Sequence, residues 1–230
     1  PHFKAPIPRG DKMIVAVNKP MGWTSFDVVD KIRSLTGEKK IGHAGTLDPF
    51  ATGVLVVGIG RESTKRLSEF TNAYKVYEAT LRLGLATDTL DVEGKRTEQK
   101  SVPHINEAKV LSVFSLFMGT IKQVPPMYSA KKVNGQRLYE LARKNITIER
   151  EAVTVKIKEL LLLSLFDHSI KFRVKCSKGT YVRQLGADIA EKLDTVGHLT
   201  DLTRTTVGEY KLEDCVEFQQ VEEQWMSTVI

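Results

Sequence analysis

Residues 42–53, which read GHAGTLDPFATG, surround one carboxylate, Asp48, with glycines and other small residues. Glycine has no side chain, so a segment of this composition lets the backbone lie directly against a ligand. The proline after Asp48 disfavours the helical conformation at the aspartate and restricts its direction. A carboxylate held in this way could act as a nucleophile. It could equally accept a backbone N–H in a turn, a common role for aspartate, and the segment alone leaves both interpretations open.

The basic residues are concentrated in one part of the chain. The whole sequence has 34 Lys and Arg against 28 Asp and Glu, a formal net charge of +6. Residues 122–150 contain seven basic and two acidic residues, which is +5, so the remainder is nearly neutral. A local basic patch on a neutral body indicates a polyanion site, most simply nucleic acid. A solvated helix face is the alternative.

Composition excludes several classes of protein. An apolar fraction of 41% over 230 residues can build a core, which argues against a disordered chain. No apolar run reaches the roughly 20 residues of a membrane-spanning helix, and the N-terminus lacks the pattern of a secretory signal. Cys176 and Cys215 cannot make a disulfide framework, so we expect a cytoplasmic protein. No low-complexity linker divides the chain, so we expect residues 1–230 to form a single domain.

The histidines and acidic residues do not predict a metal site. The five histidines lack the spacing and the cysteine neighbours of metal ligands. Asp88 and Asp91 lie among Thr87, Thr89 and Gly94, which favours a turn role for both carboxylates.

Hydrophobic patterns predict intermixed strands and helices without a regular βαβ repeat. The expected strands are Met13–Asn18, Gly53–Ile59, Tyr74–Leu83, Val153–Phe166 and Ile170–Cys176. One expected helix begins at a capping box of Thr24 and Asp27 and ends at Gly37. A second follows Pro103 and carries Val110, Leu111, Phe114 and Phe117 on one stripe. Two more helices should span Gln136–Lys144 and Thr180–Leu193. Residues 38–49 should form a loop. The fold class predicted is α+β with a mixed, largely antiparallel sheet flanked by helices.

Five motifs in order along the chain resemble those of one enzyme family. They lie at residues 19–25 (KPMGWTS), 42–53, 75–94, 123–143 and 176–183 (CSKGTYVR), and Leu202 with Arg204 follows them. Together they resemble the TruB branch of the pseudouridine synthases from about Met13 to Tyr210. The resemblance implies the pseudouridine synthase fold, with residues 122–150 as an inserted RNA-binding segment.

The resemblance implies an isomerase that converts uridine 55 in the T-loop of tRNA to pseudouridine. The base is flipped out of the RNA, detached from the ribose, turned and rejoined through carbon. Such a reaction requires a nucleophile in a dry pocket and a surface on which the flipped base can stack. It implies no organic cofactor and no metal, with the T-arm of tRNA as partner. No membrane association and no obligate protein partner are expected, and the enzyme should be a monomer.

The family's functional residues can be transferred to matching positions. Asp48 corresponds to the nucleophile, Arg183 to the arginine that keeps the carboxylate charged, and Tyr77 to the tyrosine that packs on the base. A guanidinium beside a carboxylate favours its ionised form. Five further residues are implied to bind substrate: Lys19, His43, Lys132, Tyr181 and Leu202.

Two departures from the family pattern affect the expected RNA contacts. The chain ends about twenty residues after Tyr210, so we expect no C-terminal PUA domain. Residues 202–205 read LTRT, where relatives more often have two adjacent arginines after the leucine. Phosphate contacts should therefore depend on the basic insertion, which makes affinity fall with salt.

Two other functions remain open from the sequence. A non-catalytic RNA-binding module would explain the basic insertion but gives no reason for Asp48, Tyr77 and Arg183 to occur together. An RNA-base glycosylase would use related chemistry. Ordinary glycoside hydrolysis needs two carboxylates, however, and the segment 42–53 has one.

Overall fold

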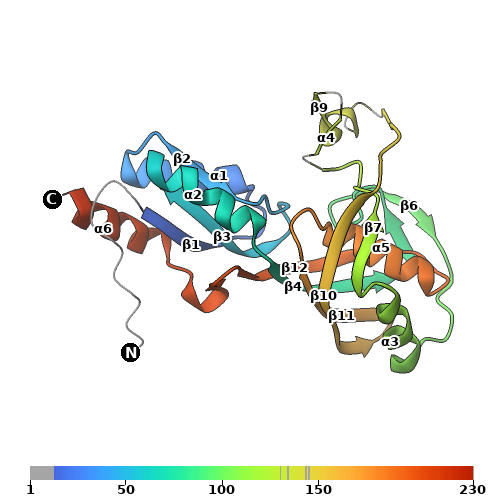
Figure 1. Ribbon diagram of the computed structural model, residues 1–230. Helices are drawn as coiled ribbons and strands as arrows, with labels where there is room; N and C mark the ends of the chain where they lie inside the picture. The colour runs from blue at the N-terminus through green and yellow to red at the C-terminus, as the bar shows by residue number, and fades with distance from the viewer. Residues whose placement is uncertain (1–12, 130, 134, 143, 145, 230) are drawn as a thin grey trace. The chain divides into compact units, whose positions relative to one another are not determined.

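The computed structural model of the chain describes residues 13–129, 131–133, 135–142, 144 and 146–229 (Figure 1). The described residues form two units: unit 1 contains residues 13–76 and 203–229, and unit 2 contains residues 77–202. The boundary falls within two strands, β4 (Lys75–Leu83) and β12 (Gly197–Val207). The expectation that residues 1–230 form a single domain stays a prediction.

Unit 1 is built on a sheet with strand order β1-β3-β12. Strand β1 (Met13–Lys19) runs antiparallel to β3 (Thr52–Ile59), and β12 runs parallel to β3. Two short strands extend this sheet, because β2 (Ile41–Ala44) pairs with β3 and β13 (Tyr210–Lys211) pairs with β12. The parallel pairing places Arg204 beside Gly53, at the point where β3 begins.

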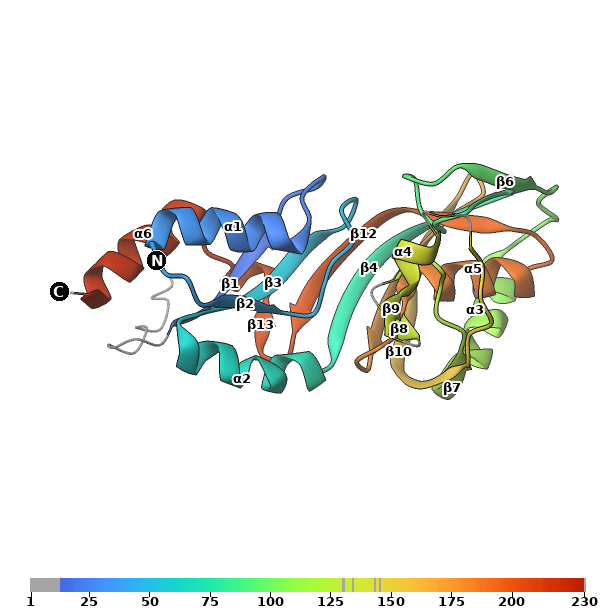
Figure 2. The ribbon, with the colours of Figure 1, turned by 90° about the horizontal axis from the view of Figure 1, so that it is seen from above.

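Helices cover both faces of the unit 1 sheet (Figure 2). Apolar side chains of α1 (Ser25–Thr36) and α6 (Phe218–Val229) pack with Val15, Val17 and Leu55 on one face. Helix α2 (Arg61–Asn72) buries its apolar side chains on the other face against alternate residues of β1 and β3. A 3₁₀ turn, η1 (Leu212–Asp214), connects β13 toward α6.

Unit 2 has the strand order β12-β4-β11-β10-β7. Strand β10 (Val153–Phe166) pairs antiparallel with both β11 (Ser169–Cys176) and β7 (Gly119–Gln123). Helix α3 (Glu107–Leu116) packs the ring of Phe114 edge-on against Phe172 of β11. Helix α5 (Val182–Lys192) lies against β4 and β12, since a Cβ on its Gly186 would meet side chains of both strands.

The remaining elements of unit 2 are two short hairpins and one short helix. Strand β5 (Leu85–Thr87) pairs with β6 (Arg96–Gln99), and β8 (Lys132–Val133) pairs with β9 (Gln136–Arg137). Helix α4 (Leu138–Ala142) follows β9 directly, and Figure 1 shows both beyond the sheet of unit 2. Strands β8 and β9 and helix α4 lie in the predicted basic insertion.

The predicted fold class is confirmed: helices flank a mixed, mainly antiparallel sheet. The capping box is also confirmed. Thr24 caps α1 by accepting from the Asp27 N–H, Asp27 accepts from the Thr24 N–H, and Gly37 ends the helix with a φ of +69°. These features depend on neighbouring residues, and local sequence therefore specifies them.

Several element boundaries were wrong. The expected loop of residues 38–49 contains β2, whose Gly42 is small enough to pass close to Leu67 of α2. The helix expected over Gln136–Lys144 is only α4, because residues 136–137 belong to strand β9. Helix α2 was not predicted, since few of its side chains are apolar. In α3, Val113 is buried whereas Leu111, expected on the buried stripe, is 51% exposed.

Candidate functional site

The segment that carries Asp48 connects β2 to β3 and turns sharply at the aspartate. The Ala51 N–H donates to the Asp48 carbonyl at 3.1 Å, which closes a turn with Pro49 at its second position. Proline suits that position because its ring fixes the required φ. Leu47 and Phe50 on either side are buried, so they anchor the turn while the Asp48 side chain remains half-buried.

Motif residues near the end of β1 hold the segment from one side. The Gly22 N–H donates to the Pro49 carbonyl at 2.8 Å, and the Lys19 ammonium donates to the same oxygen at 3.2 Å. Lys19 is fully buried and also donates to the carbonyls of Pro20 and Trp23. Its predicted role in substrate binding stays a prediction, but these contacts show an ammonium that fixes the backbone next to Asp48.

Arg204 holds both ends of the same segment. It is 1% exposed, and its Nη2 donates to the Gly45 carbonyl at 3.0 Å while its Nε donates to the Val54 carbonyl at 2.8 Å. Gly45 and Gly53 have φ angles of +81° and +107°, which glycine adopts without strain. One buried guanidinium thus ties the start of the segment to its end. Arg204 was predicted to belong to a motif, but no role was predicted for it.

His43 lies on β2, just before Gly45. Burial lowers the pKa of its imidazole below the ordinary value, and the positive charge of Arg204 lowers it further. The neutral ring is therefore favoured in the folded protein. A neutral, partly buried ring suits stacking better than phosphate binding, and the implied role of His43 in binding substrate stays a prediction.

In unit 2, Arg183 is buried in a cluster of polar groups at the start of α5. Its Nη1 donates to the Thr89 carbonyl at 2.6 Å, and its Nη2 donates to the Tyr128 carbonyl at 2.8 Å. Its Nε lies 3.6 Å from Asp91 Oδ2, and the two side chains are 4% and 5% exposed. Arg183 was predicted to keep a carboxylate charged, but its ion pair with Asp91 was not predicted.

Asp91 combines the predicted turn role with the contact to Arg183. Its Oδ1 accepts from the Thr89 hydroxyl at 2.6 Å and from the Glu93 N–H at 3.0 Å. Asp88 likewise accepts from the Lys95 N–H at 2.8 Å. The spacing of residues 87–94 indicated these local bonds, whereas the Arg183 pair joins positions 92 apart in sequence and leaves no local signal.

The other predicted site residues of unit 2 come from several elements. Tyr77 lies on β4 and is half-buried, and Leu202 lies on β12 and is 4% exposed. Tyr181 precedes α5, where its N–H donates to Gln123 Oε1 at 2.8 Å and its carbonyl accepts from Gln123 Nε2. Lys132 is on β8, and its side chain is outside the described part of the structure.

The predicted site residues therefore divide between the two units. Unit 1 brings together Lys19, His43 and Asp48 around the 42–53 segment. Unit 2 holds the other five: Tyr77, Lys132, Tyr181, Arg183 and Leu202. That all eight form one site stays a prediction.

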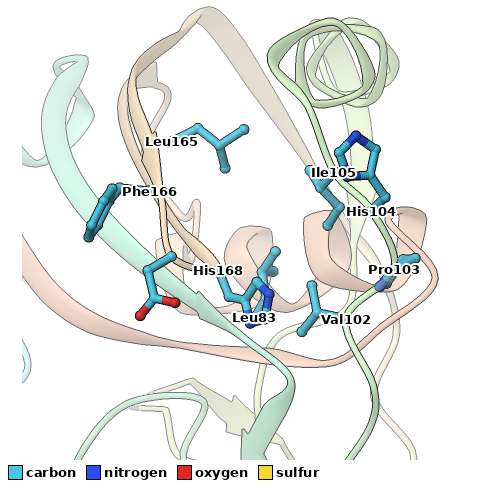
Figure 3. A pocket seen from close by; sticks show the side chains of 9 residues that line it. Leu83, Val102, Pro103, His104, Ile105, Leu165, Phe166 and His168 are labelled. Atoms are coloured by element: carbon cyan, nitrogen blue, oxygen red, sulfur yellow. The ribbon is translucent and has the colours of Figure 1, made fainter.

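Unit 2 contains a cavity of about 410 Å³ beside the turn between β10 and β11. Figure 3 shows Leu83, Val102, Leu165 and His168 around it, with His104 and Ile105 at one side. None of the predicted site residues lines this cavity. It is therefore not part of the candidate site.

The described part of the chain contains neither a cluster of metal-ligating side chains nor a helix suited to a membrane. Within the described ranges, no group of three or more His, Cys, Asp or Glu side chains could hold a metal ion. Among the helices of those ranges, none combines the length and apolar character needed to cross a bilayer.

Family models match most of the chain. The model described as TruB family pseudouridylate synthase (N terminal domain) matches residues 33–182. The model described as tRNA pseudouridylate synthase B C-terminal domain matches residues 183–228.

Individual relatives agree with the family models. The tRNA pseudouridine synthase B of Protochlamydia amoebophila is 46% identical over 209 residues, which cover 90% of this chain and 79% of that protein. The enzyme of the same name from Bacillus cereus is 46% identical over 217 residues, covering 91% of this chain and 70% of the relative.

A solved structure shares the fold. A chain of a Cbf5–Nop10–Gar1 complex matches with a TM-score of 0.71 and 27% identity over 94% of this chain. The match covers 56% of that longer chain, so our chain spans little more than half of it. The sequence, the fold and the motif positions agree, and the chain belongs to the TruB family of pseudouridylate synthases.

Proposed function

We propose that the chain isomerises uridine 55 in the T-loop of tRNA to pseudouridine, with Asp48 as the nucleophile. Family membership makes it a uridine-to-pseudouridine isomerase. One observation carries the proposed aspartate mechanism. The backbone of the Asp48 segment is bound by Lys19, Gly22 and Arg204, while Asp48 itself is half-buried.

The reaction breaks the bond between the ribose C1′ and N1 of uracil and forms a bond from C1′ to C5. C5 then loses its proton and N1, now free of the ribose, takes up a proton, so the base keeps its composition. A carboxylate nucleophile can stabilise the separated fragments without a water molecule, provided that the site excludes water. Asp48 fits this role because a turn fixes its backbone and because Leu47 and Phe50, on either side of it in sequence, are buried.

Arg183 and Tyr77 would supply the other two groups that this chemistry needs. The Arg183 guanidinium is held by two carbonyls and Asp91, so its orientation is set before substrate binds. A preorganised cation stabilises developing negative charge better than a mobile one. Tyr77 would stack on the flipped uracil, a contact worth roughly 1–3 kcal/mol per base.

The basic insertion would bind the backbone of the T-arm. Lys122 and Lys144 are exposed and Arg150 is half-buried, so charged groups of this segment are accessible to phosphates. Phosphate contacts position an RNA, whereas loop shape and extruded bases specify it. We further propose that the enzyme acts as a monomer in the cytoplasm, without cofactor or metal.

The test is the formation of pseudouridine in an unmodified T-arm hairpin incubated with the protein in EDTA. Tritium at C5 of uridine is released when pseudouridine forms, and a hairpin with cytidine at position 55 is the substrate control. We expect tritium release with the uridine hairpin alone. Failure of a folded preparation to release tritium would refute the proposal, and free uracil among the products would indicate a glycosylase.

Replacing the nucleophile separates catalysis from binding. Asp48→Asn should lower turnover by about 10⁴-fold or more, since loss of a nucleophile removes the covalent step. RNA affinity should stay within about threefold of the unmodified protein, because the phosphate contacts remain. Asp30→Asn removes an exposed carboxylate of the same unit and should retain full turnover. If Asp48→Asn kept turnover, the aspartate mechanism would be wrong.

A further inference from the structure

Ser25, the first residue of α1, makes two hydrogen bonds to a residue far away in sequence. The Leu47 N–H donates to the Ser25 hydroxyl oxygen at 2.9 Å, and the hydroxyl donates to the Leu47 carbonyl at 3.4 Å. Ser25 is 2% exposed and Leu47 is 4% exposed, so water does not replace these bonds in the folded protein. The hydroxyl thus binds both polar groups of one backbone residue.

The Leu47 carbonyl belongs to the peptide group that ends at the nitrogen of Asp48. A bond to this oxygen fixes the plane of that peptide and therefore the direction from which Asp48 leaves the chain. On the other side of the aspartate, Pro49 is held through its carbonyl by Gly22 and Lys19. Asp48 is consequently held between two anchored residues.

The hydroxyl of Ser25 has no separate task in its own helix. Thr24 caps α1, since its hydroxyl oxygen accepts from the Asp27 N–H at 3.1 Å and Asp27 accepts from the Thr24 N–H at 2.7 Å. A serine at the start of a helix usually serves as the cap. Because Thr24 performs that function, the Ser25 hydroxyl is available for Leu47.

We propose that Ser25 is a positioning residue that sets the direction of the Asp48 carboxylate through the backbone of Leu47. This inference rests on the proposed role of Asp48 as nucleophile. Displacement of a reacting group by about 1 Å can lower the rate about 100-fold. Ser25 touches no reacting atom, so its loss should change turnover without changing how tightly RNA binds.

The chain offers a matched control for a serine in unit 1. Ser63 lies in the first turn of α2, is 1% exposed, and its hydroxyl has no hydrogen-bond partner among the described residues. Ser63→Ala removes a buried hydroxyl of the same kind without touching the 42–53 segment. Any effect of losing a buried serine in general should appear in both alanine variants.

The experiment compares Ser25→Ala, Ser25→Thr and Ser63→Ala by hydrogen exchange and by steady-state kinetics. In Ser25→Ala, we expect exchange of the Leu47 amide to rise about tenfold or more, since this amide loses its acceptor. The kcat should fall about 10- to 100-fold while KM for the hairpin stays within about twofold. Ser25→Thr retains the hydroxyl and should recover most of the kcat, and Ser63→Ala should match the unmodified protein.

The proposal is overturned if Ser25→Ala and Ser63→Ala give the same exchange and the same kcat, or if Ser25→Ala raises KM alone. Should Ser25→Ala not fold, Ser25→Cys keeps the size of the side chain with a weaker hydrogen-bonding group, and the same two outcomes apply. Hydrogen exchange at the Leu47 amide tests whether Ser25 positions the backbone, even if the protein forms no pseudouridine. A failure to form pseudouridine would separately refute the proposed function.

Discussion

Buried cations are held differently in the two units. In unit 1, Lys19, Lys75 and Arg204 each donate to backbone carbonyl oxygens at distances of 2.6–3.2 Å. In unit 2, Arg183 also donates to carbonyls, but its Nε lies 3.6 Å from the Asp91 carboxylate. A carbonyl fixes the path of the chain, whereas a carboxylate balances charge as well.

This difference indicates that the region around Asp48 depends on backbone geometry and the region around Arg183 on the balance of charge. Around Asp48, the backbone of one strand lies so close to the next that the geometry should be sensitive to any added atom. Around Arg183, a nearly dry ion pair makes the balance of charge more important, because an unpaired ion in such a site is strongly destabilising. The following predictions test this contrast.

The largest expected effect comes from an added methyl group at Gly53. A Cβ there would lie 2.2 Å from the Arg204 carbonyl oxygen, at a φ of +107°. Gly53→Ala should lower the free energy of unfolding by about 4 kcal/mol, from strain and overpacking together. Gly37→Ala, at a φ of +69° with nothing within 4 Å, should cost about 1–2 kcal/mol. Urea unfolding measures both, and equal losses would contradict the close approach at Gly53.

Loss of the carboxylate of Asp91 should be the next largest effect. Asp91→Asn removes the carboxylate that pairs with the buried Arg183 guanidinium, which should lower the free energy of unfolding by about 3 kcal/mol. Asp194→Asn is the control, because Asp194 is 81% exposed in its pair with Lys109 and should cost less than about 1 kcal/mol. Similar losses in the two variants would mean that burial does not strengthen the Arg183 pair.

Exposed cations should act on binding rather than on stability. Lys122→Ala and Lys144→Ala should each weaken hairpin binding about threefold, and each should reduce the salt slope of the affinity by about 0.7. Lys31→Ala removes an exposed lysine of α1 and should leave the slope unchanged. Binding titrations at several salt concentrations give the slopes. An unchanged slope in both insertion variants would remove the insertion from the RNA contact.

The smallest effect expected is on the pH dependence of stability. Burial and Arg204 lower the pKa of His43, so the folded protein binds fewer protons than the unfolded chain in mildly acidic solution. The stability associated with this ring is fully present above its ordinary pKa of about 6.5 and is lost as pH falls. His43→Gln should reduce the drop in Tm between pH 7.5 and pH 5 by a few degrees or less. Thermal unfolding at the two pH values measures the drop, and an equal drop in His43→Gln and in the unmodified protein would contradict the lowered pKa of His43.

Short-range features of the fold could be predicted from the sequence. The α1 cap, the hairpin of β10 and β11, and the apolar stripe of α5 all depend on residues within one element or one turn. Helix α2 was missed because tertiary packing of Leu67 and Phe70, not a strong apolar pattern, stabilises it. Strand β2 was missed for a related reason, since pairing with β3 rather than its own composition makes it a strand.

The site shows the same division between local and distant information. Motif order indicated Asp48 and Arg183, and the turn at Asp48 followed from Pro49. The roles of Ser25 and Arg204 could not be predicted, since their partners lie 22 and 159 residues away in sequence. Both residues lie within motifs that were recognised, but neither had a predicted role there. Their presence in those motifs was the only sign in the sequence that they have a function.

The burial of two lysines in unit 1 has a practical consequence. Lys19 is completely buried and Lys75 is 5% exposed, with its ammonium bound to three carbonyls at the end of α2. An amine-reactive reagent should therefore modify exposed lysines first and reach these two only when unit 1 opens. The order of lysine labelling, read by mass spectrometry, would report local opening of the region around Asp48 without any introduced probe.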